Sequence, residues 1–141
     1  MTFESARDET DQILVTEQDY ERLLALLRTA RPDEVDERLL AELARAAVVP
    51  PREIPPNVVT MNSELVFVDE DSGSERKVQL VYPDHANAEA GRLSVFAPMG
   101  AALLGLSEGQ TIEWPLPQGR TKTVRVKAVA YQPEAAGHWD L

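Results

Sequence analysis

The sequence of 141 residues predicts an α+β fold, in which a short N-terminal antiparallel helical hairpin precedes an antiparallel β-sheet domain with one short helix. Three observations support this prediction. Apolar residues recur at helical spacing within residues 13–48, four prolines fall within residues 49–57, and short alternating runs follow over residues 58–141. Hydrophobic residues make up 43% of the chain, which is close to the average of globular proteins.

Two helices are predicted before residue 48. Thr16 and Asp19 form a near capping box at the start of the first helix, and Pro32 suits the first turn of the second. The apolar stripes of the two helices are formed by Tyr20, Leu23, Leu24 and Leu27, and by Val35, Leu39, Leu40, Leu43 and Ala47. Each helix is expected to span about 15 residues, or about 22 Å. Because the connection is short, the helices should fold back as an antiparallel hairpin.

The segments on either side of this hairpin have a different composition. Residues 1–12 are polar and acidic, which is typical of a disordered lead and not of a signal peptide. Residues 49–57 are proline-rich, so an extended, semi-rigid linker is expected there. The predicted C-terminal domain, residues 58–141, follows this linker, and its tail from Pro133 onward is expected to be loose.

Short alternating runs predict the strands of the C-terminal domain. They lie within residues 58–68, 77–82, 93–96, 111–114 and 121–131. Turn-forming sequences separate the first two runs and the last two, so each pair is expected to form a hairpin. Residues 98–104 predict a short helix that Gly105 ends.

Charge and composition exclude several classes of protein. The chain has 24 acidic and 14 basic residues and a net charge of −10, without a basic cluster, so direct nucleic-acid binding is not expected. The chain has no cysteine, which excludes disulfides and thiolate chemistry and favours a reducing, cytoplasmic location. No apolar run approaches the roughly 20 residues of a membrane span. A basic or mixed protein surface is the expected partner.

Residues suited to catalysis are few. His85 lies beside Asp84 in a predicted loop, and His138 lies near the end of the chain; neither placement has the spacing of a metal site. The acidic residues 69–71 lack the spacing of a calcium loop, and the glycines within residues 100–105 match no nucleotide-binding loop. The sequence therefore predicts no cofactor, no metal site, no small-molecule ligand and no enzymatic activity.

Two clusters remain as candidate functional sites. One is the predicted strand-to-helix junction, where Phe96, Pro98 and Met99 suit either the core or an exposed interface. The other is the expected tip of the helical hairpin, formed by Asp33, Glu34, Asp36 and Glu37. These acids either complement the positive end of the second helix or approach a metal or a basic surface on a partner.

The junction also carries a family resemblance. Residues 93–105 read Leu-Ser-Val-Phe-Ala-Pro-Met-Gly-Ala-Ala-Leu-Leu-Gly, and a Glu-Gly-Gln turn at 108–110 and a Pro-Gln-Gly hairpin at 117–119 follow. This pattern resembles the signature of the C-terminal domain of the Gre transcript-cleavage factors. Ala97 stands in place of the usual serine before proline, and Gln110 in place of the aspartate after glycine.

The resemblance is wider to one subfamily of the Gre factors, called regulator of nucleoside diphosphate kinase. The segments that resemble it are residues 58–63, 80–83, 97–106 and 131–137. The resemblance covers about residues 53–141 and extends more loosely over the helical hairpin.

The resemblance implies an FKBP-like domain that docks on RNA polymerase near the entrance of the secondary channel. We expect this domain to dock through the junction and its neighbours, with the contact residues Phe96, Ala97, Pro98, Met99, Ala101, Ala102 and Leu103. In Gre factors a long coiled coil enters the channel, and acidic tip residues help the polymerase's metal cleave backtracked RNA. Two helices of about 22 Å are too short for that role. A polymerase-binding regulator that competes with Gre-type factors, without cleaving RNA, is therefore predicted.

Three alternatives stay open at this point. The first is transcript cleavage in which Asp33 and Glu34 reach the metal of the polymerase. The second is a prolyl isomerase, which only the shared fold suggests, although the chain has just three phenylalanines, two tryptophans and three tyrosines for an aromatic pocket. The third is direct action on nucleoside diphosphate kinase, which the subfamily name suggests.

Overall fold

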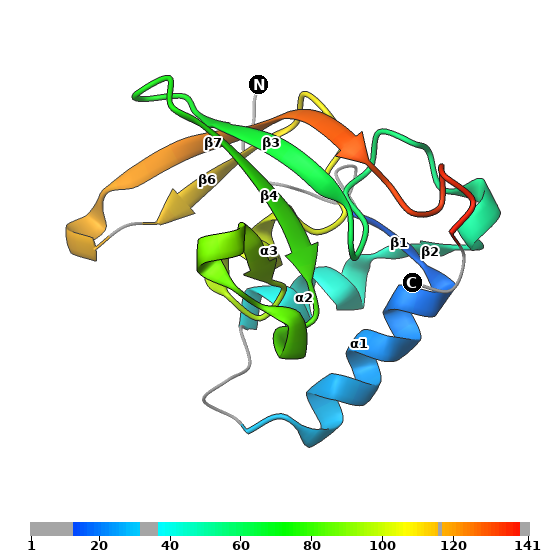
Figure 1. Ribbon diagram of the computed structural model, residues 1–141. Helices are drawn as coiled ribbons and strands as arrows, with labels where there is room; N and C mark the ends of the chain where they lie inside the picture. The colour runs from blue at the N-terminus through cyan, green and yellow to red at the C-terminus, as the bar shows by residue number, and fades with distance from the viewer. Residues whose placement is uncertain (1–12, 32–36, 116, 139–141) are drawn as a thin grey trace.

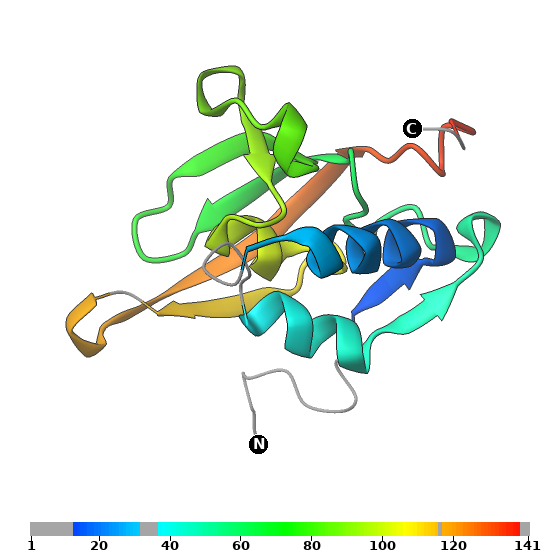
Figure 2. The same cartoon turned by 90° about the horizontal axis from the view of Figure 1, so that it is seen from below.

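The computed structural model describes residues 13–31, 37–115 and 117–138 (Figure 1). A twisted five-stranded sheet forms one layer, and the three helices lie on one side of it, as Figures 1 and 2 both show. This architecture confirms the predicted α+β class, whereas the FKBP-like comparison stays a prediction. None of the helices in the described part of the chain is long and apolar enough to cross a membrane.

The five strands lie in the order β5-β4-β3-β7-β6 across the sheet. They are β3 (Glu64–Asp69), β4 (Glu75–Val81), β5 (Arg92–Ser94), β6 (Thr111–Pro115) and β7 (Thr121–Tyr131). The predicted hairpins β3–β4 and β6–β7 are both present and antiparallel. The sheet is not entirely antiparallel as predicted, because β5 pairs with β4 in parallel. The segment between them, with two 3-10 turns, returns the chain to the start of the ladder.

The N-terminal region contains strands as well as helices. Its elements are β1 (Leu14–Thr16), α1 (Glu17–Thr29), α2 (Glu37–Arg45) and β2 (Ala47–Val49). The Thr16 hydroxyl accepts a hydrogen bond of 3.1 Å from the Asp19 N–H, which confirms the predicted N-cap. Figure 2 shows α1 and α2 running in opposite directions. The parallel pairing of β1 with β2 was not predicted, and it places Ala47 on a strand and not on the second helix.

The helices and the sheet share one hydrophobic core. Leu23 of α1 and Leu39 of α2 are fully buried, in the same cluster as residues of the sheet and of α3 (Pro98–Leu103). Ile13 lies against Gly105, where a side chain would overlap the isoleucine. The helical region is therefore packed onto the sheet and is not a separate appendage.

The predicted linker and the predicted loose tail both have defined contacts where the structure describes them. The proline-rich segment contains a 3-10 turn, and the Pro55 carbonyl accepts a hydrogen bond of 2.8 Å from Gln132 Nε2. The tail is not loose over residues 133–138, because the His138 N–H donates to the Pro133 carbonyl and its ring lies 2.6 Å from the Tyr131 hydroxyl. The predicted lead, residues 1–12, lies outside the described residues.

Candidate functional site

The strand-to-helix junction between β5 and α3 is held by its own backbone. The Ser94 carbonyl accepts a hydrogen bond of 3.0 Å from the Ala97 N–H, and the Ser94 hydroxyl accepts one of 3.0 Å from the Phe96 N–H. Ala97 is the N-cap of α3, in an extended conformation, and the helix begins at Pro98. The predicted short helix is thereby confirmed, and the junction has a fixed shape.

The structure divides six of the seven predicted contact residues into two groups; the side chain of the seventh, Pro98, lies outside what the structure describes. Phe96, Ala97 and Met99 are partly exposed, so their side chains are available to a partner. Ala101, Ala102 and Leu103 are at most 1% exposed and belong to the hydrophobic core. The prediction that these last three side chains contact a partner is therefore corrected.

The run of small residues in α3 explains this burial. A Cβ added at Gly100 would overlap the carbonyl oxygen of Ser94, so the helix approaches β5 as closely as a glycine allows. Helix α3 also contacts α2. Since a six-residue helix has less than two turns, its contacts with β5 and α2 bury residues 100–103 and leave Met99, in its first turn, partly exposed. A Gly-Ala-Ala run next to a strand is the sequence signal for such a close contact.

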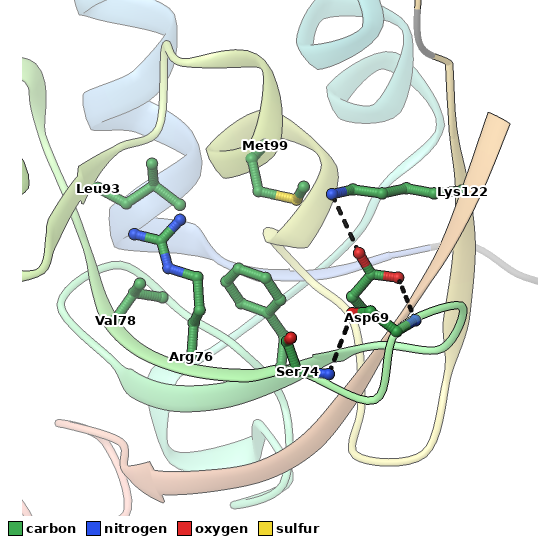
Figure 3. Close-up of a pocket in the computed structure, with 9 residues that line it drawn as sticks. Asp69, Ser74, Arg76, Val78, Leu93, Met99 and Lys122 are labelled. Atoms are coloured by element: carbon green, nitrogen blue, oxygen red, sulfur yellow. Dashed lines mark hydrogen bonds and ion pairs between the residues drawn. The ribbon is translucent and has the colours of Figure 1, made fainter. Parts of the chain in front are cut away.

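A pocket of about 280 Å³ opens beside the junction (Figure 3). Phe67 and Val78 of the sheet are buried at its base, and Leu93 and Met99 line it with their side chains. Arg76 also borders it, with its guanidinium carbon 6.0 Å from the centroid of the Phe67 ring. The pocket thus adds an apolar depression and a cation to the exposed junction.

An ion pair closes the other end of this pocket. Lys122 Nζ lies 3.2 Å from Asp69 Oδ2, as Figure 3 shows. The Asp69 carboxylate also accepts hydrogen bonds from the N–H groups of Asp71 and Ser72. These bonds confirm that residues 69–74 form the predicted turn, and they leave Asp69 fully engaged.

The predicted tip cluster falls largely outside the described residues. Asp33, Glu34 and Asp36 lie in the interval 32–36, which the structure does not describe. Glu37 is the first residue of α2. The proposed approach of these carboxylates to a metal or a basic surface therefore stays a prediction.

A buried carboxylate on α1 was not predicted as a functional group. Asp19 is 4% exposed, and its Oδ2 accepts a hydrogen bond of 3.1 Å from the Met61 N–H. Its Oδ1 accepts one of 3.3 Å from the Tyr82 hydroxyl. Asp19 therefore connects α1 to the segments that precede β3 and follow β4. The capping pattern predicted a local role for this residue, and nothing in the sequence indicated its distant partners.

The surroundings of Asp19 favour its protonated form. The pKa of Asp19 is raised from its ordinary value of 3.8 to about 6. Burial is the largest cause, and the negative charge of Glu134 is the second. The hydrogen bonds from Met61 and Tyr82 and the charge of Arg22 act in the opposite direction. Burial and the Asp19 carboxylate also raise the pKa of Tyr82. This carboxylate is thus held at an energetic disadvantage at neutral pH.

The histidines occupy exposed positions. His85 Nδ1 lies 3.8 Å from Asp84 Oδ1, and both side chains are largely exposed to solvent. An exposed pair at this distance lacks the fixed geometry of a catalytic dyad. Within the described residues, no group of three or more carboxylates and histidines could hold a metal ion.

Comparison with known proteins gives the chain a family. The family model described as "Transcription elongation factor, GreA/GreB, C-term" matches residues 54–131, and the one described as "Rnk N-terminus" matches residues 11–49. The "Regulator of nucleoside diphosphate kinase" of Escherichia coli (strain K12) is 42% identical over 131 residues, which are 92% of this chain and 96% of that protein.

Two further relatives are transcription elongation factors. GreA of Thermodesulfovibrio yellowstonii is 30% identical over 96 residues, or 68% of this chain and 60% of that protein. The solved structure of a transcription elongation factor GreA/GreB from Nitrosomonas europaea is 47% identical and matches with a TM-score of 0.70. The match covers 85% of this chain and 98% of that chain. The chain therefore belongs to the GreA/GreB family, and it is similar over almost its whole length to a regulator of nucleoside diphosphate kinase.

Proposed function

We propose that this chain regulates transcription by binding RNA polymerase near its secondary channel, where it competes with Gre-type factors without cleaving RNA. Membership in the GreA/GreB family supports the choice of partner. The main structural support is that the segment resembling the family signature, residues 93–105, contains the partly exposed junction and two residues that line a pocket, Leu93 and Met99. Phe96, Ala97 and Met99 are the contact residues of this proposal.

The shape of the junction suits a docking surface. Partly exposed apolar side chains next to an apolar pocket are a common feature of protein interfaces. The hydrogen bonds from Phe96 and Ala97 to Ser94 fix the backbone before binding. A preorganised surface loses less conformational entropy when it binds, and this loss opposes association.

The dimensions of the helices support binding without cleavage. Helix α1 has 13 residues and α2 has nine, which correspond to about 20 Å and about 14 Å. Leu23 and Leu39 are fully buried in the shared core, so part of this length is occupied by packing on the sheet. The proposed action is therefore partial obstruction of the channel entrance by a short helical pair.

The first test is binding of the labelled chain to core RNA polymerase, with and without an excess of a Gre factor. We expect saturable binding that the Gre factor displaces. Ala97→Glu and Met99→Glu should weaken binding, because each places a charge in a desolvated contact. Ala136→Glu, in the exposed C-terminal turn, is the matched control and should bind like the wild type. Absence of wild-type binding, or equal binding by all variants, would overturn the proposal.

The second test concerns cleavage. Backtracked elongation complexes should keep their full-length RNA when the chain is added. RNA shortening that disappears in the double variant Asp33→Ala and Glu34→Ala would instead establish cleavage by the tip acids.

Action on nucleoside diphosphate kinase is a second candidate, because a relative that is 42% identical carries that name. It predicts that the purified chain changes the activity of the kinase in the absence of polymerase. Unchanged kinase activity at saturating concentrations of the chain would dismiss it.

A further inference from the structure

The pocket beside the junction continues into a second depression, and together they form one groove along β4 and β5. The second depression has a volume of about 300 Å³ and shares Arg76, Val78 and Leu93 with the first. Met99 borders the first part and Ala97 the second. The groove therefore runs directly past the contact residues of the proposed docking surface. We call it the β4–β5 groove.

Two arginines on this groove have no acidic partner in the part of the chain that the structure describes. Among the residues that the structure describes, no carboxylate forms an ion pair with Arg76 or with Arg92. Nearby cations differ in this respect: Lys77, Arg125 and Lys127 are paired with Glu64, Glu70 and Glu75, respectively. In a chain with a net charge of −10, two cations on one groove without a described acidic partner are a specific feature.

The position of Arg76 follows from the register of the sheet. Arg76 lies directly opposite Phe67 in the antiparallel pair β3–β4, so both side chains project from the same face. Phe67 and Val78 are buried, whereas Arg76 is exposed where the strand leaves the core. The guanidinium carbon, 6.0 Å from the centre of the Phe67 ring, is thus held beside the apolar base of the groove.

The groove carries a net positive charge. Asp69 is the one carboxylate among the described residues that line it, and this group is already paired with Lys122 at 3.2 Å. Arg76 and Arg92 are therefore the charges available to a partner. A guanidinium binds a carboxylate with two parallel hydrogen bonds, which makes it selective for acidic groups.

We propose that the β4–β5 groove binds an acidic segment of the partner protein, with Arg76 and Arg92 pairing to its carboxylates and an apolar side chain of that segment filling the pocket between Leu93 and Met99. This inference rests on the proposed function, because it identifies the chemistry of the polymerase segment that meets the junction. A nucleic acid is the less suitable occupant, since the groove has an apolar base and the remainder of the chain repels phosphate.

Charge reversal in the full chain tests this groove. Arg76→Glu and Arg92→Glu should each weaken binding to core RNA polymerase by about 10-fold to about 100-fold, as expected when a charged hydrogen bond in an interface is lost. Arg120→Glu is the matched control, because Arg120 is an exposed arginine outside the groove without a described carboxylate partner. It makes the same change in net charge and should bind like the wild type. Circular dichroism and thermal unfolding would show that the three variants fold equally.

The outcomes separate the groove from the proposed function. Suppose that the Gre factor displaces the wild type and that Arg76→Glu, Arg92→Glu and Arg120→Glu all bind like the wild type. This result would overturn the proposed role of the groove and leave the proposal of polymerase binding intact. Equal weakening by all three variants would show a general charge effect and would also overturn it.

A second measurement does not depend on the polymerase. NMR spectra of the labelled chain would be recorded with a short synthetic peptide of alternating glutamate and leucine, and with the same peptide containing glutamine in place of glutamate. We expect shifts at residues 76, 92, 93 and 99 with the glutamate peptide only. Equal shifts with both peptides, or shifts at these residues with a single-stranded oligonucleotide and none with the peptide, would overturn the inference.

Discussion

Replacement of Asp19 by asparagine should make the protein more stable at neutral pH and should remove part of its pH dependence. In the wild type, Asp19 is 4% exposed, and its carboxylate accepts hydrogen bonds from the Met61 N–H and the Tyr82 hydroxyl. An asparagine side chain has nearly the same shape. Its oxygen can accept from Met61, and its amide can donate to the Tyr82 oxygen. The substitution therefore removes the buried charge and keeps both contacts.

The magnitude follows from the pKa of Asp19, which burial raises from 3.8 to about 6. The folded protein holds this proton more tightly than the unfolded chain does. The free energy of unfolding therefore falls as the pH rises from about 4 to about 6, and this contribution is constant above that range. Because one pKa unit corresponds to about 1.4 kcal/mol, the total is about 3 kcal/mol. The variant should gain up to this amount at neutral pH.

Urea denaturation followed by far-ultraviolet circular dichroism, at intervals between about pH 4 and about pH 8, measures this difference. The stabilities of wild type and Asp19→Asn should coincide near the acidic end and diverge toward neutral pH. Asp84→Asn is the matched control, because Asp84 is an exposed residue and its substitution should change little. If Asp19→Asn were less stable than the wild type at neutral pH, with an unchanged pH dependence, the buried carboxylate would be a net stabilising group and the reasoning would be refuted.

Two further predictions concern glycines at close contacts. Gly105→Ala should lower the free energy of unfolding by about 2–4 kcal/mol, because its φ is +80° and the added Cβ would overlap Ile13. Gly109→Ala, at a φ of +89° with open space around it, should cost about 1 kcal/mol, so equal unfolding temperatures for the two variants would contradict the contact. Gly100→Ala should force α3 away from Ser94 and lower both the unfolding temperature and polymerase affinity; a variant that retains both values would show that the close approach is not needed.

Local patterns were sufficient to predict much of the sheet. The hairpin of β3 and β4 depends on a turn whose Asp69 carboxylate accepts hydrogen bonds from the next backbone N–H groups, and such bonds are encoded by neighbouring residues. The Thr16 cap and the end of α3 before Gly105 are local for the same reason. In each of these elements, the interaction that fixes the structure lies within a few positions of the pattern that predicted it.

Pairings between distant residues could not be predicted in this way. Leu14 in β1 pairs with Ala47 in β2, across both helices, and neither segment shows the alternation of a half-buried strand. The parallel pairing of β5 with β4 could not be predicted for the same reason. The chain must turn back along β4 before β5 can begin, and no local pattern encodes this return. Apolar runs of three residues suit a helix, a strand or a buried loop equally well, and only tertiary packing selects among them.

The candidate site shows the same division. The sequence located the junction, and Phe96, Ala97 and Met99 are partly exposed there. It placed Leu103 in the interface as well, although α3 packs against both α2 and β5 and this residue is fully buried. It offered no indication of Arg76, because an unpaired cation is recognised only when the surrounding carboxylates are known to be engaged elsewhere.

The hydrogen bonds of Asp19 also fix the position of the short helical pair relative to the proposed docking surface. Met61 and Tyr82, its two partners, adjoin β3 and β4, and these strands carry Phe67 and Arg76 of the β4–β5 groove. The orientation of α1 relative to the groove is therefore fixed through the sheet and not through a flexible linker. A helix held in this way loses little conformational entropy when the groove binds its partner, so its position at the partner is determined by the docking contact itself. For a factor proposed to obstruct a channel entrance, this rigidity keeps the short helical pair in one position relative to the docking surface.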